Sequence, residues 1–169
     1  RTYTDFSGVD VGALDERTRR NFFTLKEFYS SHEHLLDNAD RPVLVHNDIH
    51  FDNILCKNGV ITGIIDFDFA RQAPKDYELW HIVDFFQSPK YFVDTASEQH
   101  WKNFVLTNEL TLLKSSYPEL FTVSNLASRI RLYMTEDILS ALKNGAVGKF
   151  NEKVEAYFGS RWLEKALGV

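Results

Sequence analysis

Two short apolar segments with a tight-turn sequence between them constrain the fold of this chain more than any other feature. The segments are 54–56 and 60–62, and Lys57, Asn58 and Gly59 separate them. Asn-Gly between apolar strands is typical of a β-hairpin, because both central residues of the tight turn need a positive φ. An antiparallel hairpin returns the chain to its starting point. Residues just before the first strand and just after the second are therefore predicted to lie together.

Polar residues stand at both of these places. The loop 46–53 reads His-Asn-Asp-Ile-His-Phe-Asp-Asn and follows a predicted strand at 43–45, while Asp66 closes a strand that looks buried. Phosphoryl transfer needs a carboxylate that receives the proton of the attacking hydroxyl, and oxygen ligands that hold Mg²⁺ on the phosphates. The order and spacing predict Asp48 as the catalytic base, with Asn53 and Asp66 as the magnesium ligands.

Neighbouring side chains are expected to support this site. Asp68 lies two residues beyond Asp66, so in extended backbone it points to the same side and supports the ion, most simply through water. His46 is expected to hydrogen-bond the backbone and to fix the loop, and His50 to order the loop or to touch phosphate. Cys56, the one cysteine, lies in an apolar strand and is expected to be a packed core thiol.

The rest of the chain is predicted to be largely helical. Apolar residues recur with the spacing of an amphipathic helix in the ranges 14–36, 77–86, 98–115, 123–142 and 154–167. Asp15 is a plausible cap of the first helix. No repeat and no Pro- or Gly-rich linker divides the chain. The fold class is therefore predicted to be α+β and mainly helical, in one lobe with a small β-hairpin.

The composition excludes several classes of partner. Lys and Arg number 19 against 24 Asp and Glu, a formal net charge of -5, so the chain has no overall basic field for nucleic acid or anionic membrane. No apolar run approaches the length of a membrane span. One cysteine excludes an internal disulfide and is compatible with a reducing compartment. A cytoplasmic protein that binds neither nucleic acid nor membrane is expected.

The segments 46–55 and 63–70 together resemble the aminoglycoside phosphotransferase and choline kinase family, small-molecule kinases with a protein-kinase-like fold. The resemblance implies ATP or GTP as phosphoryl donor, Mg²⁺ as cofactor, and the roles given above for the base and its two metal ligands. It also implies that Leu55 and Ile65 line the adenine pocket. The acceptor would be the hydroxyl of a small molecule such as an aminoglycoside, a choline-like amino alcohol or homoserine.

By the same resemblance the chain covers only the C-terminal lobe of such a kinase. The expected parts of this lobe, 1–169, are a leading helix at 14–37, the catalytic loop and metal-binding hairpin at 43–70, and a helical substrate-side subdomain at 75–168. No glycine-rich loop or β-strand Lys precedes them. The N-terminal lobe of the same protein is thus expected as a missing partner, and this chain alone is expected to be a fragment that binds nucleotide weakly and turns over little.

Further residues take their interpretation from the resemblance. Glu78 stands where the family usually has an Asp that opens a helix, with Asp76 as an alternative alignment, and Asn47 stands where most members have Gly. Acidic residues on the later helices of this family often meet cationic acceptors, which makes Glu136 and Asp137 candidate substrate-binding residues. A solvated helix face explains these two acids equally well.

Two other functions are compatible with the sequence. His46, Asp48 and His50 alternate, so on an extended strand they would face one side and form the metal triad of a metal-dependent hydrolase. A lobe derived from a kinase could also serve as a non-catalytic binding module that keeps the motif residues by inheritance.

Overall fold

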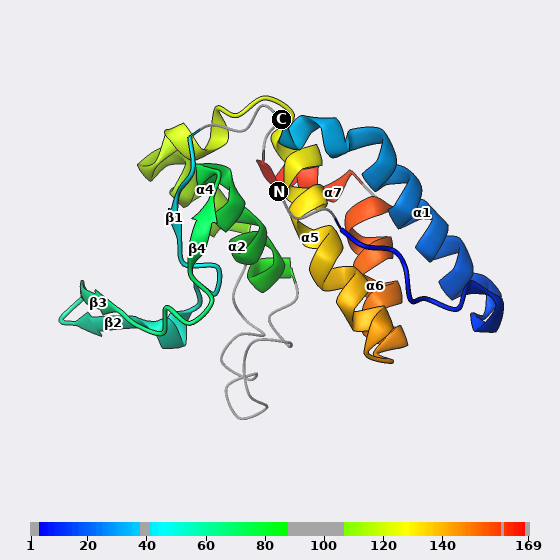
Figure 1. Ribbon diagram of the computed structural model, residues 1–169. Coiled ribbons are helices and arrows are strands. Elements are labelled where there is room, and N and C mark those ends of the chain that lie inside the picture. Colours follow the sequence, from blue (N-terminus) through cyan, green and yellow to red (C-terminus); the bar gives the residue numbers. More distant parts are fainter. Residues whose placement is uncertain (1–3, 38–40, 88–106, 160, 168–169) are drawn as a thin grey trace. The chain divides into compact units, whose positions relative to one another are not determined.

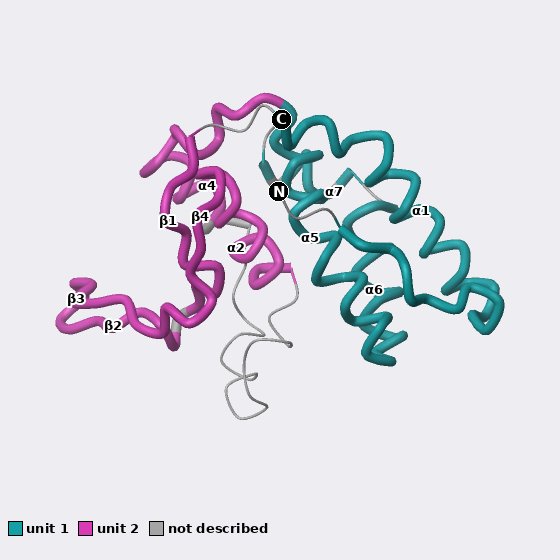
Figure 2. Tube along the Cα trace, in the orientation of Figure 1, with its two compact units in different colours: residues 1–38, 125–169 teal, residues 39–124 magenta. Residues whose placement is uncertain are grey.

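The computed structural model describes residues 4–37, 41–87, 107–159 and 161–167 (Figure 1). Its contacts divide the chain into two compact units, one made of residues 1–38 and 125–169 and the other of residues 39–124 (Figure 2). The predicted loop and hairpin lie entirely in the second unit. The candidate site can therefore be described within one unit, and the single lobe expected from the sequence stays a prediction.

The first unit is helical and packs around apolar side chains. Its elements are the 3-10 helices η1 (Val11–Ala13) and η2 (Glu33–Leu36) and the helices α1 (Glu16–His32), α5 (Leu126–Lys143), α6 (Val147–Phe158) and α7 (Trp162–Leu167). Helices α1, α5 and α6 contact one another. Their largest fully buried side chains include Phe22, Leu25, Ile130, Met134, Ile138, Phe150, Val154 and Tyr157. Removal of these side chains from water is the main force that holds the unit together.

Asp15 caps α1 as the sequence predicts. Its carboxylate accepts a hydrogen bond from the Thr18 hydroxyl at 2.6 Å and one from the Thr18 backbone N–H at 3.0 Å. The second bond satisfies a backbone group that has no partner inside the helix. The two bonds, the hydroxyl first, lower the pKa of Asp15 below its ordinary value.

The prediction of one helix over 154–167 is wrong. Helix α6 begins earlier, at Val147, and ends at Phe158, and α7 begins at Trp162. Gly159 closes α6, because its N–H donates to the Glu155 carbonyl at 3.1 Å and a Cβ there would lie 2.6 Å from that oxygen. The apolar spacing continues across the break, so periodicity alone could not locate it. Of the predicted helix 98–115, the part before residue 107 lies outside the described residues.

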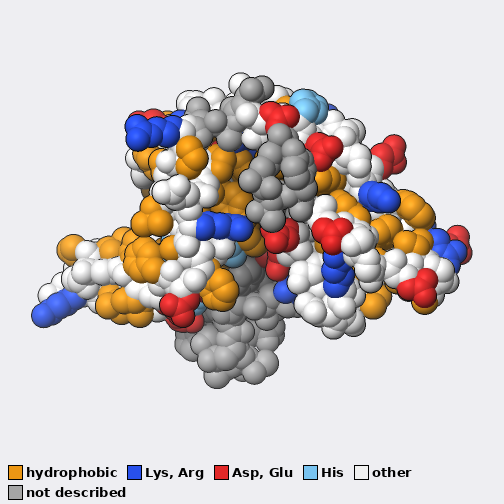
Figure 3. Space-filling model, viewed as in Figure 1, with side chains coloured by type: hydrophobic (Ala, Val, Ile, Leu, Met, Phe, Trp, Pro, Cys, Tyr) orange, Lys and Arg blue, Asp and Glu red, His pale blue; other side chains and the backbone are white. Residues whose placement is uncertain are grey.

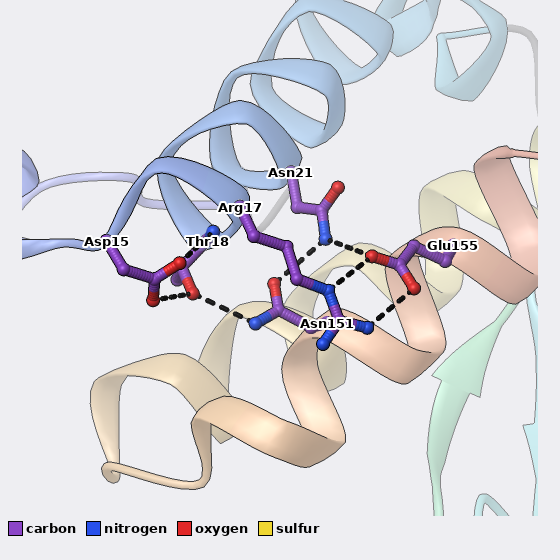
Figure 4. Close-up of polar contacts among 6 residues, drawn as sticks. All are labelled: Asp15, Arg17, Thr18, Asn21, Asn151 and Glu155. Carbon is purple, nitrogen blue, oxygen red and sulfur yellow. Dashed lines mark hydrogen bonds and ion pairs between the residues drawn. The ribbon is translucent and has the colours of Figure 1, made fainter.

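A polar network joins α1 to α6 (Figure 4). Arg17 donates two hydrogen bonds to the Glu155 carboxylate, at 2.8 and 2.7 Å. Asn21 donates to Asn151 at 2.8 Å and to Glu155 at 3.1 Å, and Asn151 donates to the Thr18 hydroxyl at 2.9 Å. The Thr18, Asn21 and Asn151 residues are buried. Because buried polar groups are costly without partners, this set of bonds fixes one register of α1 on α6.

The network predicts a pH dependence of stability. The hydrogen bonds from Arg17 and then from Asn21 lower the pKa of Glu155 from 4.5 to about 2. A carboxylate whose pKa is lowered on folding contributes stability that is present above its unfolded pKa and is lost as the pH falls toward its folded pKa. The melting temperature of Glu155→Gln should therefore lie below that of the wild type near neutral pH, and the difference should shrink toward pH ~2.

Thermal unfolding followed by circular dichroism measures this difference. The effect should be small, because the side chains of Arg17 and Glu155 are 53% and 43% exposed. Glu27→Gln, at an exposed acid on α1, is the matched control. A deficit of Glu155→Gln that stays constant across the pH range would contradict the prediction.

The second unit contains two small antiparallel sheets followed by helices. Its elements are β1 (Val43–Val45), η3 (Phe51–Asn53), β2 (Ile54–Lys57), β3 (Val60–Ile64), β4 (Arg71–Ala73), η4 (Lys75–Tyr77), α2 (Glu78–Gln87), α4 (Thr107–Ser116) and η6 (Pro118–Phe121). Strand β2 pairs with β3 through a turn in which Asn58 and Gly59 have φ of 52° and 76°, which confirms the predicted hairpin. Strand β1 pairs with β4, a strand that the sequence pattern did not predict.

The hairpin is exposed, whereas its strands were expected to be buried. Val60, Ile61 and Ile64 are 64%, 62% and 45% exposed, and Figure 3 shows hydrophobic side chains gathered over β2 and β3. Cys56 is also exposed, so the prediction of a packed core thiol is wrong. The apolar pattern identified the strands correctly, but burial requires a covering element, and the described residues place none over these side chains. No helix within the described ranges is long and apolar enough to cross a membrane.

Candidate active site

The loop 46–53 and the open end of the hairpin are tied together by backbone hydrogen bonds. The Ile65 N–H donates to the Asn53 carbonyl at 3.0 Å, directly beyond the pairing of Ile54 with Ile64. The His46 side chain donates from Nε2 to the Ile65 carbonyl at 2.8 Å. Asp66 follows Ile65 directly in the chain. The predicted convergence at this end of the hairpin is therefore confirmed.

Asn53 is the centre of the loop's hydrogen bonds. It is buried, and its Nδ2 donates to the Asp48 carbonyl at 2.9 Å. The same nitrogen lies 3.4 Å from the Asp48 carboxylate and 3.2 Å from His50 Nε2. Three acceptors around Nδ2 fix the orientation of the amide and direct Oδ1 away from them. Asn53 thus contacts both Asp48 and His50, and the role of His50, to order the loop or to touch phosphate, stays a prediction.

The oxygens at this end suit a hard cation. In the described part of the chain, neither Asn53 Oδ1 nor the exposed carboxylate of Asp66 has a hydrogen-bond partner. Mg²⁺ takes few protein oxygens and keeps several waters alongside substrate phosphates. An amide oxygen and a carboxylate at one hairpin end therefore fit this ion, and Asn53 and Asp66 are the residues that would hold it.

Two non-glycine residues of the site have left-handed backbone conformations. Asn47 and Asp66 both have φ of 62°, a region that Asn and Asp enter more readily than other residues because their short side chains bond locally. Asp68 was expected to point to the same side as Asp66 because extended backbone was assumed there. Since Asp66 is not extended, that assumption is wrong. Asp68 instead lies in an exposed turn closed by the Ala70 N–H on the Phe67 carbonyl at 2.9 Å. The role of Asp68 in supporting the metal ion stays a prediction, and extended backbone no longer provides a reason for it.

His46 is placed for structural support. Because a carbonyl oxygen can only accept, the bond to Ile65 puts the ring proton on Nε2. Nδ1 is buried without a partner, and the ring packs on Phe67 with 4.7 Å between centroids. The metal triad of His46, Asp48 and His50 is therefore not assembled. Across the described residues, no group of three or more His, Cys, Asp or Glu side chains is arranged to hold a metal ion.

Glu78, at the start of α2, holds the beginning of the loop. Its carboxylate accepts from the His46 N–H at 2.7 Å and from the Asn47 N–H at 3.1 and 3.2 Å. The resemblance aligned Glu78, or alternatively Asp76, with the family's helix-opening Asp and left the hydrogen bonding open. The signal was an acid in the first turn of a helix that closely follows the motif.

The remaining candidates are placed as follows. Leu55 and Ile65, the expected adenine contacts, are 46% and 44% exposed at the hairpin. Glu136 and Asp137 belong to α5 in the other unit, where Glu136 is exposed. Asp137 accepts from Lys153 Nζ at 2.8 Å, so its charge is already paired. A cationic acceptor would have to compete with that lysine for Asp137.

Comparison with known protein families identifies the family of this chain. The profile of the phosphotransferase enzyme family matches residues 5–103, more than half of the chain. The chain belongs to the phosphotransferase enzyme family. The matched residues include the whole of the loop 46–53 and both strands of the hairpin, whereas the candidate substrate-binding residues Glu136 and Asp137 lie outside the match.

A crystal structure related to this family has a similar fold. It is that of a thermostable mutant of aminoglycoside phosphotransferase APH(4)-Ia in its apo form, which matches 89% of this chain with a TM-score of 0.59 and 18% sequence identity. At this identity the likeness concerns the fold alone. The match covers 47% of the aminoglycoside phosphotransferase, so this chain spans about half the length of that protein. A search of curated proteins gave no significant match.

Proposed function

We propose that this chain carries the catalytic site of an ATP-dependent, magnesium-requiring phosphotransferase that acts on the hydroxyl of a small molecule. One observation carries the proposal. Asn53 donates to the carbonyl of Asp48, while its own carbonyl accepts from the residue before Asp66. A base and two oxygen ligands are thereby held at one hairpin end by the same side chain and backbone. Phosphoryl transfer depends on such positioning more than on covalent help from the protein.

The reaction assigns one role to each residue. Asp48 orients the acceptor hydroxyl and takes its proton as the hydroxyl oxygen bonds to the γ-phosphorus, while the bond from that phosphorus to the bridging oxygen of ADP breaks. Asn53 Oδ1 and Asp66 would hold Mg²⁺, which supplies neutralisation of the phosphate charge. His46, through the Ile65 carbonyl, and Glu78, through the His46 N–H, keep the beginning of the loop in position. GTP is an alternative to ATP as the phosphoryl donor. Leu55 and Ile65 would contact the nucleobase of the donor.

The exposed hairpin supports a missing N-terminal lobe as the partner of this chain. Exposed hydrophobic side chains of the second unit are Val43, Leu44, Leu55, Val60, Ile61, Ile64, Ile65, Phe67 and Phe69. A partner lobe that covered these side chains would remove apolar surface from water and would also complete the nucleotide site. Calorimetry should find weak ATP binding by this chain and tighter binding by the complete gene product. Equal affinities would contradict the missing lobe.

A phosphorylation screen of the complete gene product tests the function itself. The protein, with Mg²⁺ and ATP or GTP, is offered amino alcohols, aminoglycosides and hydroxy amino acids, and transfer is followed by ADP or GDP release and by mass of the product. At least one acceptor should gain a phosphoryl group, and chelation of the metal should stop the transfer. If no acceptor is modified under conditions in which the protein is folded, the non-catalytic binding module becomes the better explanation. A cytoplasmic location remains a prediction from the sequence.

A further inference from the structure

Arg71 is a basic side chain held beside the catalytic loop that the proposed reaction does not use. It lies on β4 opposite Val45, the residue that leads into the loop. Its Nη2 donates to Asn47 Oδ1 at 3.5 Å, and Asn47 directly precedes Asp48. Strand register and side-chain contact therefore both place the guanidinium next to the residue before the base.

The guanidinium is fixed in orientation but keeps most of its donors. Its Cζ lies 4.5 Å from the centroid of the Tyr77 ring, and Tyr77 is buried. Stacking on an aromatic face holds the planar group still. Of its five N–H donors, the described part of the chain engages one, in the long bond to Asn47, and offers Arg71 no carboxylate within ion-pair distance. An exposed, oriented guanidinium without an acid partner is suited to bind a carboxylate or a phosphate.

Arg71 is the basic residue of this part of the chain that is best placed to bind an anionic group near Asp48. The basic residues between β1 and the start of α2 are Lys57, Arg71 and Lys75. Lys57 lies at the turn end of the hairpin, away from the loop, and Lys75 already has an interaction of its own. Among the acids, Glu78 is used by the loop amides. A negatively charged acceptor group near Asp48 would therefore meet Arg71 as its counter-charge.

We propose that Arg71 determines acceptor specificity by binding an anionic group, a carboxylate or a phosphate, on a molecule whose hydroxyl is presented to Asp48. This inference rests on the proposed function and narrows its substrate class to hydroxy acids or hydroxylated phosphate esters. Among the acceptors named above it selects the homoserine type over choline-like and polycationic ones. Arg binds such groups through two parallel N–H donors, so Lys is not an equivalent replacement.

Matched acceptors test the proposal in the complete gene product. L-homoserine is compared with its neutral partner L-homoserinol, and glycerate and glycerol phosphate are each compared with neutral glycerol. Each pair differs in the anionic group, and comparison of glycerate with glycerol phosphate separates carboxylate from phosphate. Arg71→Gln should raise KM for the preferred anionic acceptor by about 10- to 100-fold, with little change in kcat or in KM for ATP. Arg71→Lys should recover part of the loss. Lys57→Gln, which removes a charge from the hairpin turn, should behave as wild type.

A binding measurement separates failure of this inference from failure of the proposed function. In nuclear magnetic resonance spectra, the Arg71 Nε–Hε signal is assigned by its loss in Arg71→Gln. Its chemical shift should change saturably on addition of the anionic acceptor and not on addition of the neutral partner. No shift, or equal use of both members of each pair, overturns the inference while transfer activity persists. A kcat loss shared by all acceptors also overturns it, because it would place Arg71 on the transferred phosphate. Absence of transfer to any acceptor overturns the proposed function instead, and the shift still reports on Arg71.

Discussion

Asp48→Asn should lower the turnover of the complete gene product by about a hundred- to ten-thousand-fold. The amide has nearly the size of the carboxylate but cannot take the proton of the acceptor hydroxyl. The loop should keep its shape, because Asn53 makes its shorter bond, 2.9 Å, to the Asp48 main-chain carbonyl and a longer one, 3.4 Å, to the side chain. Steady-state kinetics should show the loss in kcat with little change in KM, and the melting temperature should stay close to that of the wild type.

Asp52→Asn is the matched control for this substitution. Asp52 lies in the same loop and also stands within 3.9 Å of His50, but its side chain is 82% exposed, against 28% for Asp48. The two variants remove the same charge from the same loop. If Asp48 is the base, turnover of Asp52→Asn should remain near that of the wild type. Comparable losses in both variants, or full activity of Asp48→Asn, would remove Asp48 from that role.

The parts of the site that the sequence predicted are those set by neighbours along the chain. Asn58 and Gly59 favour the tight turn by their own backbone preferences. Once that turn is fixed, antiparallel pairing brings Asn53 and Ile65 together, and Asp66 follows without any longer-range information. The cap of α1 by Asp15 is equally local. These features needed no knowledge of the rest of the fold.

The errors arose where distant residues or single dihedral angles decide. Strand β4 consists of Arg71, Gln72 and Ala73, which have no strong strand preference, and it forms because β1 is available to pair with it. The burial of Cys56 was predicted wrongly, because a strand pattern predicts the strand but not whether another element covers it. The predicted orientation of Asp68 was based on the alternation of side chains along extended backbone. That alternation ends at Asp66, which has a left-handed backbone conformation. In each case the local pattern was compatible with more than one environment.

Glu78→Ala should lower turnover by about 10- to 100-fold and reduce stability by roughly 1–3 kcal/mol. The carboxylate is the acceptor for the backbone N–H groups of His46 and Asn47, and it stands in the first turn of α2, where a negative charge is favourable. Alanine leaves both amides without their partner, so the residues leading to Asp48 can leave the conformation in which Asn47 has φ of 62°. Kinetics and thermal unfolding of the complete gene product measure the two effects.

Conservative variants distinguish positioning of the loop from general support of the fold. Glu78→Gln keeps the size and one acceptor oxygen, so it should recover part of the lost kcat, because one of the two amides regains its bond. Glu119→Ala, which removes an exposed acid from the first turn of η6, should change neither kcat nor stability appreciably. A positioning residue requires that kcat falls in the folded protein, measured well below its melting temperature. If Glu78→Ala lowers only the melting temperature, Glu78 stabilises α2 and the loop amides without setting the geometry of Asp48.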